Sequence, residues 1–307
     1  MNTTPSSAPH LTGERALVLG GGGSTGNAWL IGVIAGLFDA GLDTTTADLT
    51  IGTSAGSTAA AQMAGATPTE LLAATLAPVP QKRTGPVGSG RARGPNRSME
   101  EHLERLRQVV ASSEDVADWR RRMGGAALDR DAASDGSWSP QWRATVASRL
   151  PSVHWPERTV LITAVDAHSG EPVAFDRHSG VDLVDAVAAS CAGGGLPYRI
   201  GEHRYIDGGY RANAENADLA AGFKRVLVLS PLGGRSLHPV DWGTHLAAQV
   251  DELRAGGSRV ETIVPDGSSE HLFGANAMDL SLRPPAARVG HDQGKALAEE
   301  LTEFWRR

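Results

Sequence analysis

Several features that mark particular protein classes are scarce in this 307-residue sequence. Cys191 is its single cysteine, which excludes an intramolecular disulfide and favours a reducing compartment. It has no run of about 18 apolar residues of the kind that spans a bilayer, so any contact with a membrane is expected to be peripheral. The formal net charge is −6, so a broad basic surface for nucleic acid is not expected.

The N-terminus also lacks the basic start and apolar centre of a secretion signal, and we expect a cytoplasmic protein. Residues 1–13 are polar and predict a disordered tail. Residues 14–307 contain no repeat or clear linker and predict a single α/β domain. Within it we expect a mobile insertion around residues 80–140, because residues 81–97 are rich in Gly, Pro and basic residues, and the chain after Gly124 lacks periodicity again until about residue 140.

Short apolar runs alternate with helical patterns, which indicates a mostly parallel sheet with right-handed crossovers. The strands are expected at residues 15–19, 48–52, 159–165, 225–229 and 260–264, with 173–175 pairing beside the third. The helices are expected at residues 27–40, 55–64, 181–189, 241–254 and 285–305, with a further helix following a capping box formed by Ser98 and Glu101.

The sharpest motif is Gly52-Thr53-Ser54-Ala55-Gly56, a G-x-S-x-G between an expected strand and an expected helix. A serine there sits on a sharp turn with its hydroxyl exposed, and small flanking glycines let the backbone pass. The N–H of Ala55 and the positive end of the helix would favour a developing oxyanion. The alternative is a serine that merely caps a helix.

A second motif is the glycine-rich stretch of residues 20–26, which contains Gly21, Gly22, Gly23 and Gly26. Consecutive glycines allow backbone N–H groups to converge on an anionic oxygen, as an oxyanion hole requires. The same residues match G-x-G-x-x-G, the dinucleotide-binding pattern of some oxidoreductases. That function needs an acidic residue at the end of the second strand, where this chain has Ser54, while Asp48 lies at the beginning of the strand.

A third motif is Asp207-Gly208-Gly209. Its aspartate is a candidate general base, provided that a pocket raises its proton affinity, although an Asp-Gly pair is also a common turn. Taken together and in this order, the three motifs resemble the patatin-like phospholipase family, and Ser190, Cys191 and Pro197 also resemble the family pattern before its aspartate.

The resemblance implies a three-layer α/β/α fold with a mostly parallel central sheet. It also implies a lipid acyl hydrolase with a Ser–Asp dyad, in which Ser54 is the nucleophile, Asp207 is the base, and the amides of Gly21, Gly22 and Gly23 bind the oxyanion. The substrate would be a lipid or small ester, and no cofactor is implied. Many family members have Arg or Lys where this chain has Thr25, so no cationic contact is carried over to that position.

Other features are less specific. The histidines after Asp207 include His238 and His291, which allow a Ser–Asp–His order, but Ser54 follows too few strands for the usual triad fold. No His or Cys spacing indicates a metal site. Tryptophans and arginines in the middle of the chain suggest either a lipid-facing lid or ordinary packing, and packing is the simpler interpretation: Trp119, Trp138, Trp142, Trp155, Arg120, Arg121 and Arg122. A catalytically silent binding or regulatory module is the non-enzymatic alternative, and the oligomeric state is not predicted.

Overall fold

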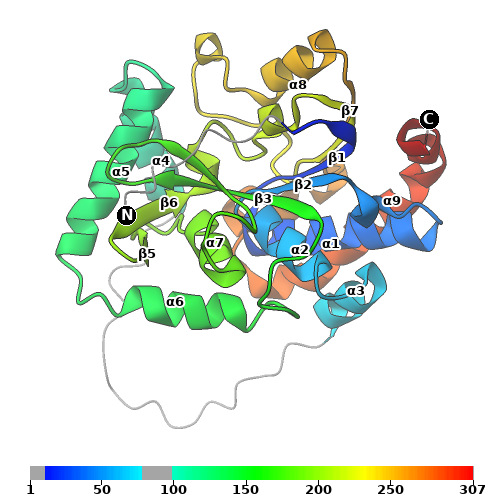
Figure 1. The fold of residues 1–307 in the computed structure, drawn as a ribbon, viewed down its shortest axis with the longest axis horizontal. Coiled ribbons are helices and arrows are strands. Elements are labelled where there is room, and N and C mark those ends of the chain that lie inside the picture. Colours follow the sequence, from blue (N-terminus) through cyan, green and yellow to red (C-terminus); the bar gives the residue numbers. More distant parts are fainter. Residues whose placement is uncertain (1–10, 78–98, 307) are drawn as a thin grey trace.

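A central sheet with helices on both faces organises the part of the chain that the computed structural model describes, residues 11–77 and 99–306 (Figure 1). Its strands are β1 Gly13–Leu19, β2 Leu49–Gly52, β3 Thr159–Asp166, β4 Pro172–Phe175, β5 Tyr198–Ile200, β6 His203–Asp207, β7 Phe223–Leu229 and β8 Arg259–Ile263. The helices are α1 Gly23–Asp39, α2 Ala55–Met63, α3 Pro68–Leu76, α4 Met99–Ala111, α5 Val116–Ala132, α6 Trp138–Ala147, α7 Leu183–Ser190, α8 Leu246–Ala255 and α9 Arg283–Arg306.

The sheet has the order β5-β6-β3-β2-β1-β7-β8, with β4 paired to β3. The strands from β3 across to β8 pair in parallel, and β4, β5 and β6 form an antiparallel portion at the other end. The predicted class is confirmed: this is a three-layer α/β/α fold with a mostly parallel central sheet. Because the carboxyl ends of β1 and β2 lie together, the segments that follow them meet at one edge of the sheet.

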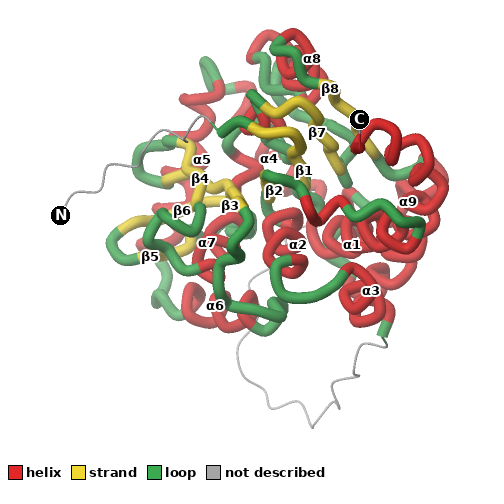
Figure 2. Tube along the Cα trace, turned by 45° about the vertical axis from the view of Figure 1, so that its right-hand side comes forward, coloured by secondary structure: helices red, strands yellow, loops and turns green. Residues whose placement is uncertain are grey.

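Alternating residues of the central strands supply the two cores. In β1, Leu17 and Leu19 pack with α1, α2, α7 and α9, whereas Ala16 and Val18 face the opposite core, to which α8 contributes. This period of two is what a strand buried on both faces requires, since successive side chains point to opposite sides. Figure 2 shows α1, α2, α3 and α9 grouped together and α8 on the far side of β7 and β8.

Helix α1 begins four residues earlier than the sequence predicted and includes the last glycines of the glycine-rich stretch. It packs in parallel against α9 at very short range. A Cβ atom at Gly32 would lie 2.2 Å from the carbonyl oxygen of Ala287, and one at Gly36 would lie 2.1 Å from that of His291. Glycine therefore permits the two helices to touch backbone to backbone, and it places the start of α9 beside the start of α1.

The prediction of irregular chain between Gly124 and residue 140 is wrong, because α5 continues to Ala132 and α6 starts at Trp138. Gly124 suggested a break, but its role is close packing: a Cβ atom there would lie 2.2 Å from the carbonyl oxygen of Ala167. The tryptophans of this region pack as expected, since Trp119 is buried and the indole N–H groups of Trp142 and Trp155 donate to backbone carbonyls.

Other boundaries differ in smaller ways. The helix expected from residue 241 begins at Leu246, because Gly243 adopts a left-handed conformation and ends a short 3-10 turn. The strands β5 and β6 were not predicted, being only three and five residues long and carrying charged side chains. The expected tail falls outside the described residues except for residues 11–13, of which Gly13 already belongs to β1, and residues 78–98 of the expected insertion also lie outside them.

Candidate active site

Ser54 lies on the turn between β2 and α2 in a strained backbone conformation, with φ 51° and ψ −113°. Few non-glycine residues adopt a positive φ, and such strain concentrates at functional sites. The flanking glycines are sterically required: a Cβ atom at Gly56 would lie 1.9 Å from the carbonyl oxygen of Leu19, and one at Gly52 would lie 2.7 Å from the Cα atom of Ser57. This local geometry is that of a nucleophile elbow.

The fold brings Asp207 to this serine. Strand β6 runs antiparallel to β3 with Asp207 opposite Ala164, and β3 in turn lies beside β2. As a result, the Ser54 hydroxyl donates a hydrogen bond to Oδ2 of Asp207 over 2.9 Å, across 153 residues of sequence. Since Asp207 ends its strand, its carboxylate stands at the sheet edge where the elbow projects.

Burial raises the pKa of Asp207 from 3.8 to about 6. Desolvation is the dominant cause, and the hydrogen bonds from the Gly209 N–H and the Ser54 hydroxyl oppose it. A carboxylate with this proton affinity is a better base for a hydroxyl than an exposed aspartate. Gly208 fits tightly here, because a Cβ atom would lie 2.2 Å from Oγ1 of Thr163.

The predicted oxyanion donors fall into two groups. The N–H groups of Gly22, Gly23 and Ala55 have no hydrogen-bond acceptor among the described residues. Gly21 differs from the prediction: its N–H donates to the carbonyl of Ala214 over 2.8 Å, so it is occupied in this conformation. Gly21 is instead next to the nucleophile: a Cβ atom on Gly21 would lie 3.5 Å from the Cβ atom of Ser54.

The glycine-rich stretch is held against Pro231, whose ring would be met by Cβ atoms at both Gly22 and Gly26. The dinucleotide alternative finds no support from Asp48. This residue precedes β2, at the end of the strand opposite to Ser54, and its carboxylate accepts the N–H groups of Glu14 and Arg15.

Four polar residues that the sequence did not assign to the site hold its two halves together. The buried hydroxyl of Ser190 accepts the N–H of Ser54 over 2.9 Å. The side-chain N–H groups of Asn216 reach Oγ1 of Thr53 and the carbonyl of Gly208, each over 3.0 Å. Oγ1 of Thr53 also lies 2.9 Å from that of Thr163. The sequence offered partial signals for three of them: Thr53 lies within the G-x-S-x-G motif, Ser190 within the stretch that resembles the family pattern, and Asn216 shortly after the Asp-Gly-Gly turn.

The thiol of Cys191 contacts the backbone of Ser54 and the first turn of α2. Its thiol donates to the carbonyl of Ser54 and lies 3.5 Å from the hydroxyls of Ser57 and Thr58. Burial raises the pKa of the thiol from 9.0 to about 11, so it stays protonated at neutral pH. Cys191 is therefore a packing and hydrogen-bonding group at this site, and its thiolate is disfavoured.

The histidines considered for a triad interact with residues other than Ser54 and Asp207. Nδ1 of His238 pairs with the Thr244 hydroxyl over 2.8 Å, and burial lowers the pKa of His238 from 6.5 to about 4. Nε2 of His291 lies 3.0 Å from a carboxylate oxygen of Asp39. Among the described residues, no histidine is hydrogen-bonded to the pair of Ser54 and Asp207.

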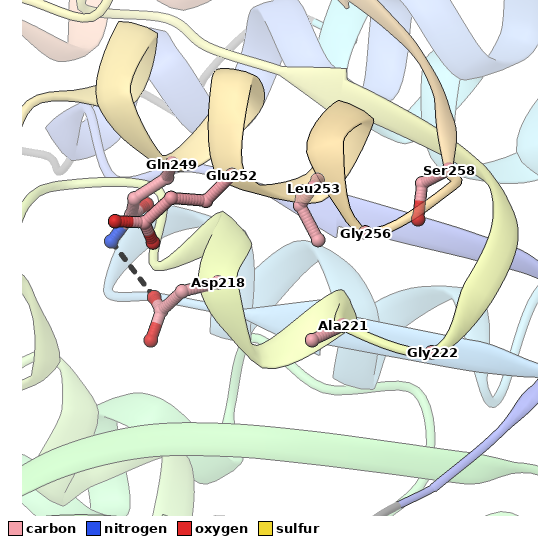
Figure 3. Close-up of a pocket in the computed structure, with 8 residues that line it drawn as sticks. All are labelled: Asp218, Ala221, Gly222, Gln249, Glu252, Leu253, Gly256 and Ser258. Atoms are coloured by element: carbon pink, nitrogen blue, oxygen red, sulfur yellow. Dashed lines mark hydrogen bonds between the residues drawn. The ribbon is translucent and has the colours of Figure 1, made fainter.

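Two cavities lie away from Ser54. One of about 90 Å³ is lined by α8 and the segment before β7; within it Gln249 donates to Asp218 (Figure 3). The other, of about 200 Å³, is bordered by Pro231, which also packs on the glycine-rich stretch, and by residues that include Arg235, Val264 and Phe273. Neither cavity includes the Ser54 or Asp207 side chain in its lining, so the site is at the sheet edge and not in either of these hollows.

The described residues contain no group of three or more His, Cys, Asp or Glu side chains arranged to hold a metal ion. In residues 11–77 and 99–306, no helix has both the length and the apolar character needed to cross a membrane.

The family model described as patatin-like phospholipase matches residues 17–220, a span that includes the elbow, the glycine-rich stretch and the Asp-Gly-Gly turn. No curated protein sequence matches the chain. The crystal structure of VipD from Legionella pneumophila is similar over 96% of this chain and 68% of that one, with 15% identity and a TM-score of 0.41. On the family match, this chain belongs to the patatin-like phospholipase family.

Proposed function

We propose that the chain hydrolyses carboxylic esters of lipids through an acyl-enzyme on Ser54, with Asp207 as the general base. The hydrogen bond of 2.9 Å from the Ser54 hydroxyl to Asp207 is the observation that carries the proposal. It joins a strained nucleophile to a carboxylate of raised pKa, and family membership makes a lipid ester the expected substrate. Contact with a membrane would be peripheral, and a cytoplasmic location remains a prediction.

In the first half of the reaction, Asp207 takes the proton as Ser54 Oγ attacks the ester carbonyl. The tetrahedral oxyanion would be stabilised by the free N–H groups of Gly22, Gly23 and Ala55, each good donor contributing about 3 kcal/mol. Asp207 then returns the proton to the departing alcohol, and the acyl group remains on Ser54. The positive end of α2, which begins at Ala55, adds to this stabilisation.

In the second half, Asp207 takes a proton from water, which attacks the acyl-enzyme. Collapse of the second tetrahedral intermediate releases the fatty acid and returns the proton to Ser54. No histidine is needed, because the carboxylate contacts the nucleophile directly.

The test is release of p-nitrophenol from short and medium acyl esters by wild type and Ser54→Ala. We expect the variant to lose at least about 10³-fold in kcat while remaining folded. A fluorophosphonate probe should label wild type at Ser54 and leave Ser54→Ala unlabelled. Equal rates for the two proteins would contradict the assignment of Ser54, and a folded wild type with neither turnover nor labelling would indicate a silent binding module.

A further inference from the structure

Glu215 is a buried carboxylic acid that the proposed mechanism does not use. It is 1% exposed, and its Oε1 atom accepts a hydrogen bond of 2.7 Å from the hydroxyl of Ser230. Its other oxygen, Oε2, is buried and has no hydrogen-bond partner in the described chain, and no described cation pairs with the group. A carboxylate that is desolvated and unpaired is strongly disfavoured, and burial raises the pKa of Glu215. The group therefore lies inside the protein in its uncharged form.

The segment that carries Glu215 contacts all three motifs of the site. The carbonyl of Ala214 accepts the Gly21 N–H over 2.8 Å. The carbonyl of Glu215 accepts the Thr53 hydroxyl at 3.5 Å, and Asn216 bonds both the elbow and the Asp-Gly-Gly turn. The position of this segment therefore affects the nucleophile, the base and the glycine-rich stretch together.

The Glu215 side chain meets the residues that directly follow β1 and β7. A Cβ atom at Gly20, which follows β1, would lie 3.3 Å from Cγ of Glu215 and 3.2 Å from Cδ of Pro231. Ser230, which follows β7, donates to Glu215 and precedes Pro231, the residue that packs against the rest of the glycine-rich stretch. Gly20 therefore contacts both Glu215 and Pro231, and the hydrogen bond from Ser230 links these two contacts.

The contacts of Gly20 matter because glycine-rich backbone does not hold its own shape. Glycine has wider conformational freedom than any other residue, so neighbouring groups must fix the stretch. The proposed oxyanion donors Gly22 and Gly23 follow Gly20 by two and three residues, while the N–H of Gly20 itself donates to the Leu229 carbonyl over 2.9 Å. Such donors are effective only when they lie within about 0.5 Å of the required position. An uncharged side chain beside the stretch also avoids repulsion of the oxyanion.

We propose that Glu215 is a positioning residue that holds the glycine-rich stretch in the geometry for oxyanion binding, acting as an uncharged acceptor for the Ser230 hydroxyl. The proposal rests on the acyl hydrolase function and adds to it a group that does not touch the substrate. Glu215 acts through its contact with Gly20 and its hydrogen bond to Ser230. At position 215, side-chain shape and a hydrogen-bond acceptor are therefore required, and negative charge is not.

The kinetic test compares Glu215→Leu with Glu215→Gln on p-nitrophenyl esters. Leucine removes the acceptor, so kcat should fall by about tenfold to 100-fold with KM little changed, because the oxyanion forms only during the reaction. Glutamine keeps the shape and an acceptor oxygen, so its kcat should stay within about threefold of wild type. Ser230→Ala removes the same hydrogen bond from its donor, should also lower kcat, and serves as the test if Glu215→Leu does not fold. The matched control is Ser258→Ala, whose buried hydroxyl donates to the Phe223 carbonyl at the other end of β7, and its kcat should equal that of wild type.

Amide hydrogen exchange separates this role from the hydrolytic function. Mass spectrometry would follow the peptide that contains Gly20 and Gly21, whose N–H groups are both hydrogen-bonded. Its exchange should be at least about tenfold faster in Glu215→Leu and unchanged in Glu215→Gln and Ser258→Ala, a result that supports the positioning role even if no ester is hydrolysed.

Three outcomes would overturn the proposal. One is Glu215→Gln as inactive as Glu215→Leu, because charge would then be required. Another is wild-type kcat in folded Glu215→Leu and Ser230→Ala with only a lower melting temperature, because the role would then be purely structural. The third is equal exchange of the glycine-rich peptide in wild type and folded Glu215→Leu.

Discussion

The Ser54 elbow and the Asp207 turn are held in place by different kinds of contact. At the elbow, the constraints are steric and come from neighbouring backbone: a Cβ atom at Gly56 would lie 1.9 Å from the carbonyl oxygen of Leu19. At the turn, Gly208 packs closely against Thr163, and hydrogen bonds from polar side chains, above all from Asn216, add to this constraint. Asp207 also depends on burial for its basicity.

This difference indicates how the two halves should respond to mutation. Changes at the elbow glycines force backbone to move and should first affect folding. Changes at the polar groups around Asp207 leave the backbone path possible, and should first affect the position and proton affinity of the base. The predictions below test whether that separation holds.

The largest effect is expected for Asp207→Asn. The amide cannot accept the serine proton as a carboxylate does, so kcat should fall by about 10³-fold while the variant remains folded. Turnover of p-nitrophenyl esters and a thermal melt would measure the two properties. His238→Ala and His291→Ala are the controls, because both histidines bond elsewhere. If either one is folded but inactive, a histidine base replaces Asp207 in the mechanism.

The pH profile is expected to show the next largest effect. Asp207 must be ionised to accept a proton, and burial places its pKa at about 6. The value of kcat/KM for an uncharged ester should therefore rise about tenfold per pH unit below this pKa and level off above it. A profile that stays flat from pH 7 down to the ordinary aspartate pKa of about 4 would show that the pKa of Asp207 is not raised.

Asn216→Ala should have a smaller effect on the same base. The substitution removes the hydrogen bonds that link Thr53 to the Gly208 turn, so kcat should fall on the order of tenfold to 100-fold with little change in KM. The apparent pKa of the pH profile should also shift. Asn276→Ala is the matched control, because that side chain only bonds the carbonyl of His271 in an exposed turn. A lower melting temperature with unchanged kcat and pH profile would mean that Asn216 has only a structural role.

The smallest effect concerns stability in α5, which packs against Val165 of β3 and Ile206 of β6 at the antiparallel end of the sheet. A Cβ atom at Gly125 meets nothing within 4 Å, so Gly125→Ala should raise the free energy of unfolding by about 0.5–1 kcal/mol. Gly124→Ala should lower it by about 1–3 kcal/mol, because the methyl group meets the Ala167 carbonyl. Urea denaturation of both variants measures the difference. Similar free energies of unfolding for Gly124→Ala and Gly125→Ala would show that the sheet beside α5 shifts to accommodate the added methyl group.

Much of the fold followed from local pattern. The central strands are short apolar runs buried on both faces, and the long helix α9 has strong periodicity, so both were predicted with small errors at their ends. The errors occurred where a glycine is required by close packing against a segment far away in the sequence. Gly124 suggested a break within a helix, and Gly23 was assigned to a loop although it starts α1, because nothing in the local sequence shows which backbone packs against them.

By itself, the sequence determined the Ser54 elbow, because its glycines, strand and helix are contiguous and their steric requirements are local. The tertiary structure alone decided the rest of the site. Antiparallel pairing of β6 with β3 brings Asp207 to Ser54, burial raises the pKa of its carboxyl, and the Ala214 carbonyl occupies the Gly21 N–H. Each of these depends on groups far apart in the chain, whose distance and desolvation exist only after the sheet has formed.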